Sequence, residues 1–376
     1  MLDPVIQFFA RVFAAIGRGI GMLIAAILWP FAAAVRWWRR RGGIVKIAIG
    51  VLVALFVVAN LYFAWQTQTW AGYDPDYAQA YVRQPGAVPA GEPVAPASGD
   101  SADRTCAPSQ IARVAADLTD WNVDTNAWVP SMLFYKLGFF GLDWARTPFF
   151  DNKAAFQRGV HVAVQRTAVE LTDTLGRVRG TSEIDPDLRD ARGNLQYRED
   201  VWYVTTRNGF PTPIATTPSV YRDAARSLRR FNERLVACEA RFDPRADNLI
   251  NLLDRIAKDI GSVSEAIRAR SELSNAGWFD VRADDQFWFA LGQLYGYHGV
   301  LQAAEADFAD VIQTRDLGPL YDRMQEQLRT TLDLSPMIVS NGDEDGFVMP
   351  THLTTLGFYV LRVRANLVEI RSVLDR

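Results

Sequence analysis

One uninterrupted apolar stretch, residues 44–65, constrains this chain more than any other feature, and it reads IVKIAIGVLVALFVVANLYFAW. A helix of that length, rising about 1.5 Å per residue, crosses a hydrocarbon core of about 30 Å. Aromatic side chains that suit the membrane interface flank it, with Trp37 and Trp38 before it and Trp65 at its end. We therefore expect one transmembrane helix over residues 44–65.

The charges differ on the two sides of this stretch. A basic cluster comes before it and at its start (Arg36, Arg39, Arg40, Arg41 and Lys46), whereas residues 66–69 carry no charge. The positive-inside rule places such a cluster in the cytoplasm, which predicts that the body of the chain is exported. Residues 1–65 hold seven of the 40 Lys and Arg but one of the 43 acids. The remaining body is acidic, and it lacks the basic surface that nucleic acid binding requires.

Residues 1–43 form a basic, membrane-associated head in this interpretation. Five apolar residues share one face of an expected amphipathic helix (Ile6, Phe9, Phe13, Ile16 and Ile20). Residues 19–35 are then apolar and uncharged, and only Pro30 interrupts them. The head therefore either lies on or dips into the inner leaflet, or forms a hairpin with the next helix. A cleavable signal peptide is the alternative, but no clear cleavage site follows Trp65.

We divide the exported part into a tether and a folded domain. Residues 66–107 are rich in Pro, Gly and Ala, which predicts a flexible tether that lets the folded part stand off the membrane. Residues 108–376 are expected to form a periplasmic helical domain, because apolar residues recur there at helical spacing. The clearest stretches are residues 221–242, 249–267, 287–301 and 353–374. The predicted fold class is mainly α: a membrane helix or helices followed by an exported helical bundle.

One region, between Arg179 and Pro218, breaks the helical pattern. Residues 201–206, VWYVTT, fit a short strand or an extended arm, and three prolines follow. We expect the bundle to carry one irregular excursion here, and excursions of this length are often functional. The candidates for a partner surface are Glu183, Asp185, Trp202, Tyr203 and Phe210.

The chain has two cysteines, Cys106 and Cys238, and both fall in the exported body. An oxidising compartment favours their pairing, and two cysteines allow one connectivity. The alternative is a pair of small buried apolar side chains, since Cys238 lies on the apolar stripe of its helix.

Patterns for metal binding are sparse. None of the three histidines has a second histidine four residues later, so we expect no catalytic zinc, and His298 fits a core or rim position. Asn341, Asp343 and Asp345 match positions 1, 3 and 5 of a calcium-binding loop, but His352 stands where the bidentate glutamate belongs. An acidic loop that caps the last helix is the alternative to this partial calcium site.

Patterns for catalysis are equally sparse. Ser182 and Glu183 faintly resemble the catalytic stretch of lytic transglycosylases, but in reversed order and without its aromatic neighbours. Helix capping, and pairing of Glu183 and Asp185 with nearby arginines, explains these acids more simply. No serine-nucleophile elbow or phosphate-binding loop occurs in a usable context. The sequence therefore favours a protein without catalysis and without a cofactor.

Aromatic residues are dense in two places, residues 121–150 and 278–297. Core packing explains most such residues. Any that are exposed would mark a partner surface or a lipid-facing apron, because large apolar patches rarely go unused.

The stretch from Asp151 to Val204 resembles the most characteristic part of an uncharacterised proteobacterial membrane-protein family, catalogued only as a domain of unknown function. The residues that carry the resemblance are Asp151, Asn152, Phe156, Gln157, Gly159, Arg166, Leu171, Asp173, Gly176, Arg177, Gly180, Leu188, Gly193 and Trp202. The resemblance implies no reaction. It implies a single-pass protein of the bacterial inner membrane, with a cytoplasmic N-terminus and a periplasmic C-terminal domain.

These expectations combine into a membrane-anchored periplasmic scaffold or assembly component. Its expected partners are the lipid bilayer and either envelope proteins or further copies of itself. The expected anchor residues are Trp37, Trp38, Arg39, Arg40, Arg41 and Trp65. A protein that binds or cleaves peptidoglycan is the alternative, and a calcium or ligand sensor is the third hypothesis. A polar cleft with converging carboxylates would favour the alternative, whereas a flat or self-complementary apolar patch would favour the scaffold.

Overall fold

A computed structural model of the chain describes residues 22, 29–30, 33–94, 105–138, 143–144, 147, 150–177, 183–207, 209–274, 276–277, 279–343 and 349–376. The chain divides into two compact units, Met1–Tyr62 and Phe63–Arg376, which we describe separately. Most of the head expected over residues 1–43 lies outside the described residues.

Helix α2 (Gly43–Gln68) begins in the first unit and includes the apolar stretch of the sequence. Most of its apolar side chains are exposed, as those of Ile44 and Leu52 illustrate, whereas Phe63 near its end is buried. Within the described part of the chain, α2 is the one helix that is long and apolar enough to cross a membrane. Before it, the guanidinium of Arg41 lies over the ring of Trp37, 4.6 Å from its centroid.

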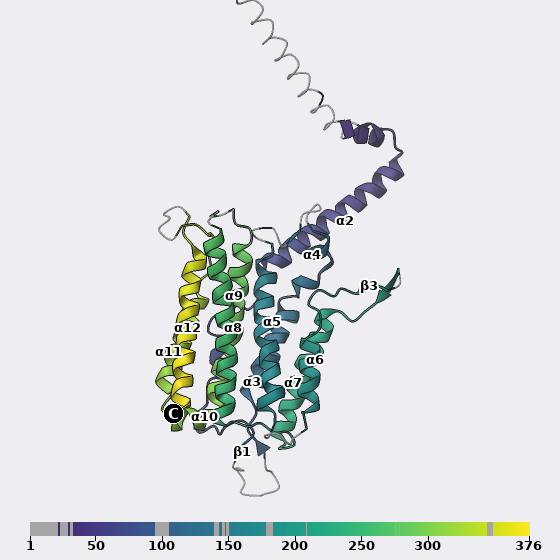
Figure 1. Cartoon of the computed structure of the whole chain (residues 1–376). Helices are drawn as coiled ribbons and strands as arrows, with labels where there is room; N and C mark the ends of the chain where they lie inside the picture. Colours follow the sequence, from purple (N-terminus) through teal and green to yellow (C-terminus); the bar gives the residue numbers. More distant parts are fainter. Residues whose placement is uncertain are drawn as a thin grey trace, which may run out of the picture. The chain divides into compact units, whose positions relative to one another are not determined.

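The second unit is mostly helical, which confirms the predicted fold class. Its long helices are α3 (Gln110–Asp120), α5 (Asn152–Glu170), α6 (Pro186–Leu195), α7 (Thr217–Val236), α8 (Ala246–Leu273), α9 (Ala283–Asp307), α11 (Gly318–Leu332) and α12 (His352–Leu374). Shorter helical segments are η1 (Tyr77–Tyr81), η3 (Trp121–Thr125), η4 (Val129–Ser131), α4 (Leu133–Leu137), η6 (Leu171–Leu175) and α10 (Ala309–Thr314). Figure 1 shows the long helices of this unit side by side, with α12 and α6 on opposite sides.

Helix α9 forms the centre of this bundle. All its residues from Ala290 to Ala304 are buried, including Tyr295 and Tyr297. The sequence pattern had predicted an amphipathic helix with one buried stripe. Helix α9 is instead covered on several sides, because α3, α5, α8 and α11 all pack against it.

Glycines let α5 and α9 approach each other closely. A Cβ atom at Gly159 would lie 2.1 Å from the carbonyl oxygen of Phe289, and one at Gly292 would lie 2.1 Å from that of Phe156. Any side chain at these positions would clash with backbone, so the pair packs at this distance only because both residues are glycine.

Four helices begin at a capping side chain. Ser109, Asp185, Thr216 and Thr351 each accept a hydrogen bond from a backbone N–H in the first turn of α3, α6, α7 and α12. The acidic loop expected to cap the last helix does not do so, because Thr351 holds that position.

Two short antiparallel sheets accompany the helices. Strand β1 (Pro93–Val94) pairs with β2 (Thr105–Cys106), and β3 (Val204–Arg207) pairs with β4 (Phe210–Pro213). A disulfide joins Cys106 in β2 to Cys238, just after α7, with Cα atoms 5.3 Å apart. The two cysteines therefore form the pair that an oxidising compartment was expected to favour.

Residues 69–94 differ from the free tether that their Pro and Gly content predicted. Trp70, Tyr73 and Tyr77 pack against the core. The hydroxyl of Tyr77 donates to the carbonyl oxygen of Tyr295 at 2.5 Å, and that of Tyr73 donates to the carbonyl oxygen of Leu332 at 2.6 Å. Tyr81 is buried in the same core, and these four aromatic residues supply the apolar area that docks the segment. The rest of the expected tether, residues 95–104, lies outside the described residues.

We use the name α2 end for the end of the second unit where residues 63–69 lie, with the starts of α5, α9 and α12, the ends of α4 and α8, and the loop that follows α11. Lys153 of α5 donates to the carbonyl oxygens of Gln66 and Thr69 there, at 3.0 and 2.7 Å. Antiparallel bridges join Asn341 to Gly277 and to Thr351, so the loops after α8 and α11 meet at this end. Strand β1 and the C-terminus lie at the opposite end (Figure 1).

Candidate functional site

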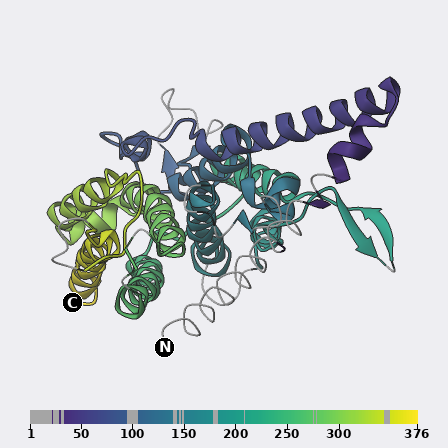
Figure 2. The same cartoon turned by 90° about the horizontal axis from the view of Figure 1, so that it is seen from above.

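The β3–β4 hairpin leaves the helical bundle and carries exposed apolar side chains. Figures 1 and 2 both show it projecting away from the helices. Phe210 is 74% exposed, Tyr203 is 66% exposed and Val204 is 46% exposed. The excursion predicted between Arg179 and Pro218 is less irregular than expected: it contains helix α6 and two paired strands, where the sequence had indicated one strand and no helix.

The two edges of the hairpin differ in their hydrogen-bonding groups. The backbone N–H of Ile214 donates to the carbonyl oxygen of Tyr203, so these two residues form a hydrogen-bonded pair. Hydrogen-bonded and non-hydrogen-bonded pairs alternate along the two strands, so the backbone N–H and C=O groups of Val204 and Thr206 point outward, away from β4. Their partners Pro213 and Pro211 face outward from β4 and have no N–H to donate. The outer edge of β3 can therefore pair with another strand, whereas prolines block the outer edge of β4.

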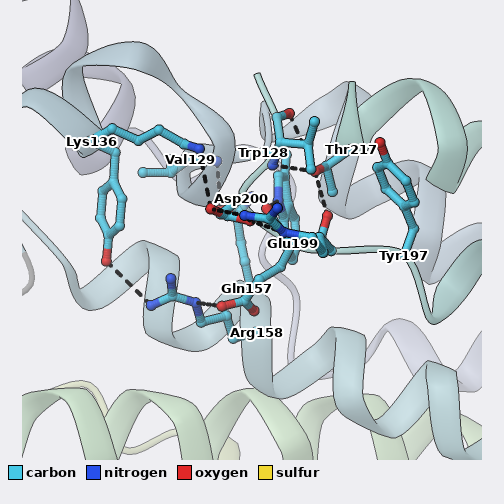
Figure 3. A network of polar contacts seen from close by, with 12 residues as sticks. Trp128, Val129, Lys136, Gln157, Arg158, Tyr197, Glu199, Asp200 and Thr217 are labelled. Atoms are coloured by element: carbon cyan, nitrogen blue, oxygen red, sulfur yellow. Dashed lines mark hydrogen bonds and ion pairs between the residues drawn. The ribbon is translucent and has the colours of Figure 1, made fainter. Parts of the chain in front are cut away.

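A rigid polar base holds both ends of this hairpin (Figure 3). The hydroxyl of Thr217 donates to the carbonyl oxygen of Arg198 at 2.7 Å and accepts from the N–H of Val201 at 2.9 Å. The indole N–H of Trp128 donates to the carbonyl oxygen of Glu199 at 2.7 Å. Trp128 and Thr217 are both buried, so these bonds fix the backbone from which the hairpin extends.

A buried glutamine ties the same base to helix α5. The amide nitrogen of Gln157 donates to the carbonyl oxygens of Asn122 and Ala127 at 2.9 and 3.1 Å, and its amide oxygen accepts from the N–H of Val129 at 3.1 Å. Figure 3 shows Gln157 beneath Trp128 and Val129. The segment that carries Trp128 is therefore fastened to the bundle by side-chain bonds.

Ion pairs surround the base. The guanidinium of Arg158 lies 3.0 Å from the carboxylate of Glu199, and the ammonium of Lys136 lies 3.2 Å from that of Asp200 (Figure 3). Partial burial would raise the pKa of Asp200, but the hydrogen bonds and charges of Lys136 and Arg198 outweigh it and lower that pKa. A hollow of about 420 Å³ lies beside these pairs and is lined by Lys136, Arg158 and Asp200, among others. It is large enough to receive a side chain.

A second polar group lies at the α2 end, where the starts of α5 and α9 meet. Asp151 and Asp284 are buried, and Asp285 is half-buried. Burial, followed by the charges of Asp285 and Asp284, raises the pKa of Asp151 to about 9. Burial and the charge of Asp285 raise the pKa of Asp284 to about 7, and burial raises that of Asp285 to about 6 against the charge of Arg158. The group can exchange protons near neutral pH.

The end of α2 is held beside this acidic group. Phe63 is buried against Trp144, with ring centroids 4.9 Å apart, and it also meets Phe134. Burial lowers the pKa of Lys153, the donor to Gln66 and Thr69, to about 8. These contacts join the last turns of α2 firmly to the bundle.

The structure assigns Asp185 a structural role. Its carboxylate caps α6 and accepts from the guanidinium of Arg234 at 2.7 Å. Glu183 is exposed and lines a hollow of about 410 Å³ with Asp185 and Arg189. Glu239 also lines this hollow, whereas none of the described lining residues is aromatic, so no aromatic side chain stands beside Glu183 in the described part of it.

The partial calcium motif is used for loop packing. The amide nitrogen of Asn341, which is fully buried, donates to the carboxylate of Asp280 at 2.8 Å, and Asp343 is exposed. Asp345 lies outside the described residues. In the part of the chain that the structure describes, no three His, Cys, Asp or Glu side chains are placed to hold a metal ion.

The histidines are bonded within the core. His298 hydrogen-bonds through Nδ1 to the amide oxygen of Gln325 at 2.7 Å, as expected for a core position. His161 hydrogen-bonds to the carbonyl oxygen of Leu195, and burial lowers its pKa to about 4. Neither is placed as a general base.

The fold and the site together define a mostly helical protein with one apolar helix suited to a membrane and one exposed two-stranded arm. Residues 122–376 match a family described as an uncharacterized protein conserved in bacteria (DUF2333), and the chain belongs to this family. The stretch from Asp151 to Val204 lies within the match, whereas α2 and residues 66–107 lie outside it. No curated protein and no solved structure matches the chain.

Proposed function

We propose that this protein is a membrane-anchored scaffold of the bacterial envelope, which binds another protein, or a second copy of itself, through the β3–β4 hairpin. The observation that carries the proposal is the exposed hairpin itself: a strand with an open edge and two exposed aromatic side chains, held on a rigid base. Such an edge recognises an extended segment by adding it as a further strand.

The anchoring part of the proposal rests on α2 and on the charges before it. Helix α2 has the length and composition of a membrane span. Arg39, Arg40 and Arg41 precede it, so the positive-inside rule favours a cytoplasmic N-terminus and an exported second unit. The disulfide between Cys106 and Cys238 supports export, because such bonds persist in oxidising compartments.

The binding part rests on the contrast between the two hairpin edges. Backbone bonds from Val204 and Thr206 would supply affinity along β3, and Tyr203 and Phe210 would supply apolar contacts. The partner would thus be a protein with an exposed strand or an extended segment. The firm attachment of α2 to the same unit would hold this partner close to the membrane.

The proposal is tested by photo-crosslinking in intact membranes, with a photoreactive amino acid at position 210 of the full chain. We expect a discrete adduct from position 210 and none from position 368. Val368 is an exposed residue of α12, and α12 lies on the side of the bundle opposite the hairpin (Figure 1). Two differently tagged copies of the chain distinguish self-association from binding of another protein.

A matched pair of variants isolates the strand edge. Thr206→Pro removes an N–H that faces outward from β3 and leaves the β3–β4 bonds in place, so the adduct should disappear. Thr206→Ala keeps this N–H, so the adduct should persist. Absence of any adduct from positions 203, 204 and 210, with a monomer in gentle detergent, would contradict the proposal.

A further inference from the structure

The α2 end carries large apolar side chains that no described part of the chain covers. Leu273 is 84% exposed, Phe279 is 82% exposed and Met337 is 86% exposed. Leu137 at the end of α4 and Met349 before α12 are exposed as well. Side chains of this kind are unusual as a group on one surface of a water-soluble domain.

These residues come from four separate segments that meet at one end of the unit. Leu273 ends α8 and Phe279 follows it, close to the bridge between Gly277 and Asn341. Met337 lies in the loop after α11, four residues before Asn341, which the bridges to Gly277 and Thr351 place at this end. The apolar surface is thus assembled by the fold.

Helix α2 leads from this end of the unit toward the expected membrane. Its apolar run continues to Trp65, and Phe63, Gln66 and Thr69 are bound to the bundle by the contacts of Trp144 and Lys153. Only a few residues of chain therefore separate the membrane-spanning part of α2 from the α2 end. If α2 spans a bilayer, this end of the unit lies at the bilayer surface through covalent continuity alone.

We propose that the α2 end rests on the bilayer and inserts the side chains of Leu273, Phe279 and Met337 into its interface. The inference rests on the anchoring role of α2 proposed above. Apolar side chains of this size partition into the boundary between headgroups and acyl chains. The bundle is then held against the membrane at several points, and α2 is one of them.

The charges at this end specify the kind of lipid surface. Glu272 and Asp343 are exposed there, and so is Arg282 at the start of α9. Glu272 forms an ion pair with Arg268. No excess of basic side chains accompanies the apolar residues in the described loops of this end, so attraction to anionic lipids is not expected. The surface should rest equally well on zwitterionic and anionic bilayers.

The test uses the full chain in lipid nanodiscs. Both native cysteines are joined in the disulfide, so a cysteine introduced at position 273, 279 or 337 is the only free thiol and takes an environment-sensitive fluorophore. Position 368 is the control, because Val368 lies 16 residues beyond His352 along α12, or roughly 24 Å at 1.5 Å per residue. Spin-labelled lipids then report which fluorophores touch the bilayer.

We expect quenching at positions 273, 279 and 337 to exceed that at 368 several-fold, in phosphatidylcholine and equally after addition of phosphatidylglycerol. Quenching at the level of position 368, with α2 resistant to alkaline extraction, would overturn the inference while leaving the anchor intact. Extraction of the chain by alkali would instead overturn the anchor. A fluorophore that becomes protected from water as the protein concentration rises, without quenching by spin-labelled lipid, would assign the surface to a second copy and overturn the inference.

Discussion

Asp151 shows how a single buried residue makes the stability of the bundle depend on pH. The pKa of this carboxyl is raised from its ordinary value of 3.8 to about 9, first by burial and then by Asp285 and Asp284. From about pH 4 to about pH 9 the folded protein holds a proton that the unfolded chain has released. The free energy of unfolding therefore falls as the pH rises through this window.

We predict that Asp151→Asn removes much of this dependence, because asparagine is a neutral isostere of the protonated side chain. At pH 8 the variant should be more stable than the parent by about 1–3 kcal/mol, and by less at pH 5. Thermal or urea unfolding across this pH range measures the difference. The control is Asp310→Asn, since Asp310 is exposed on α10. A parallel pH dependence in parent and Asp151→Asn would show that Asp151 does not titrate in this way.

At the level of single residues, the sequence predicted which aromatic side chains are exposed better than it predicted which charged side chains are buried. Tyr203 and Phe210 were expected at a partner surface, and both are exposed on the hairpin. The burial of Asp151 and Lys153 had no signal in the sequence spacing, because each depends on neighbours far along the chain, at residues 284 and 66. Asp151 was noted only through the family resemblance, without a role.

At the level of helices, the close contact between α5 and α9 depends on glycines, which have no side chain to keep the two backbones apart. We predict that Gly292→Ala destabilises the protein by about 1–3 kcal/mol or more, because its Cβ would meet the backbone of Phe156 and force the helices apart. The same change at Gly193 of α6 provides the control, since no atom outside the helix's own neighbouring backbone lies within 4 Å of a Cβ there. Gly193→Ala should stabilise the protein by up to about 1 kcal/mol through helix propensity alone.

Equilibrium unfolding of the two variants separates packing from propensity. If both changes were stabilising, the helices would not be in close contact, and the arrangement of α5 and α9 would be wrong. Opposite signs are expected because the added methyl group is the same and only its surroundings differ.

Amphipathic periodicity predicted the helices that bury one face. It failed for the helix that is buried on several sides and for the segments that are not helical. The stripes over residues 249–267 and 353–374 correspond to α8 and α12. The stripe over residues 221–242 corresponds to α7 only as far as Val236, so Cys238, expected on the helix, lies just beyond its end. Helix α9 is buried on several sides, whereas its sequence pattern predicted one buried stripe and gave no sign of its central position. Residues 69–94 were assigned to a tether from composition, because averaging over prolines concealed the four aromatic residues that dock it. Strand β4 was missed because its two prolines are typical of a loop and not of a strand.

On the scale of the whole molecule, the disulfide and α2 fix opposite ends of one unit. The bond between Cys106 and Cys238 closes a loop with a sequence separation of 132 and secures β2 beside the end of α7. Chain entropy alone gives such a loop a stabilisation of roughly 4–5 kcal/mol, as an upper value. Such bonds persist in oxidising compartments and are rare in reducing ones, so this bond supports the proposed export of the unit.

The state of these two thiols in cells therefore tests the orientation of the entire chain. We predict that a thiol-reactive polyethylene glycol applied to acid-quenched cells leaves the full chain unmodified, and that prior reduction adds two labels. A Cys106→Ser variant should instead take one label without reduction, which verifies that the reagent reaches Cys238. Two labels on the unreduced parent chain would place the second unit on the reducing side and reverse the proposed topology. The hairpin would then face the cytoplasm, and its partner would have to be sought there.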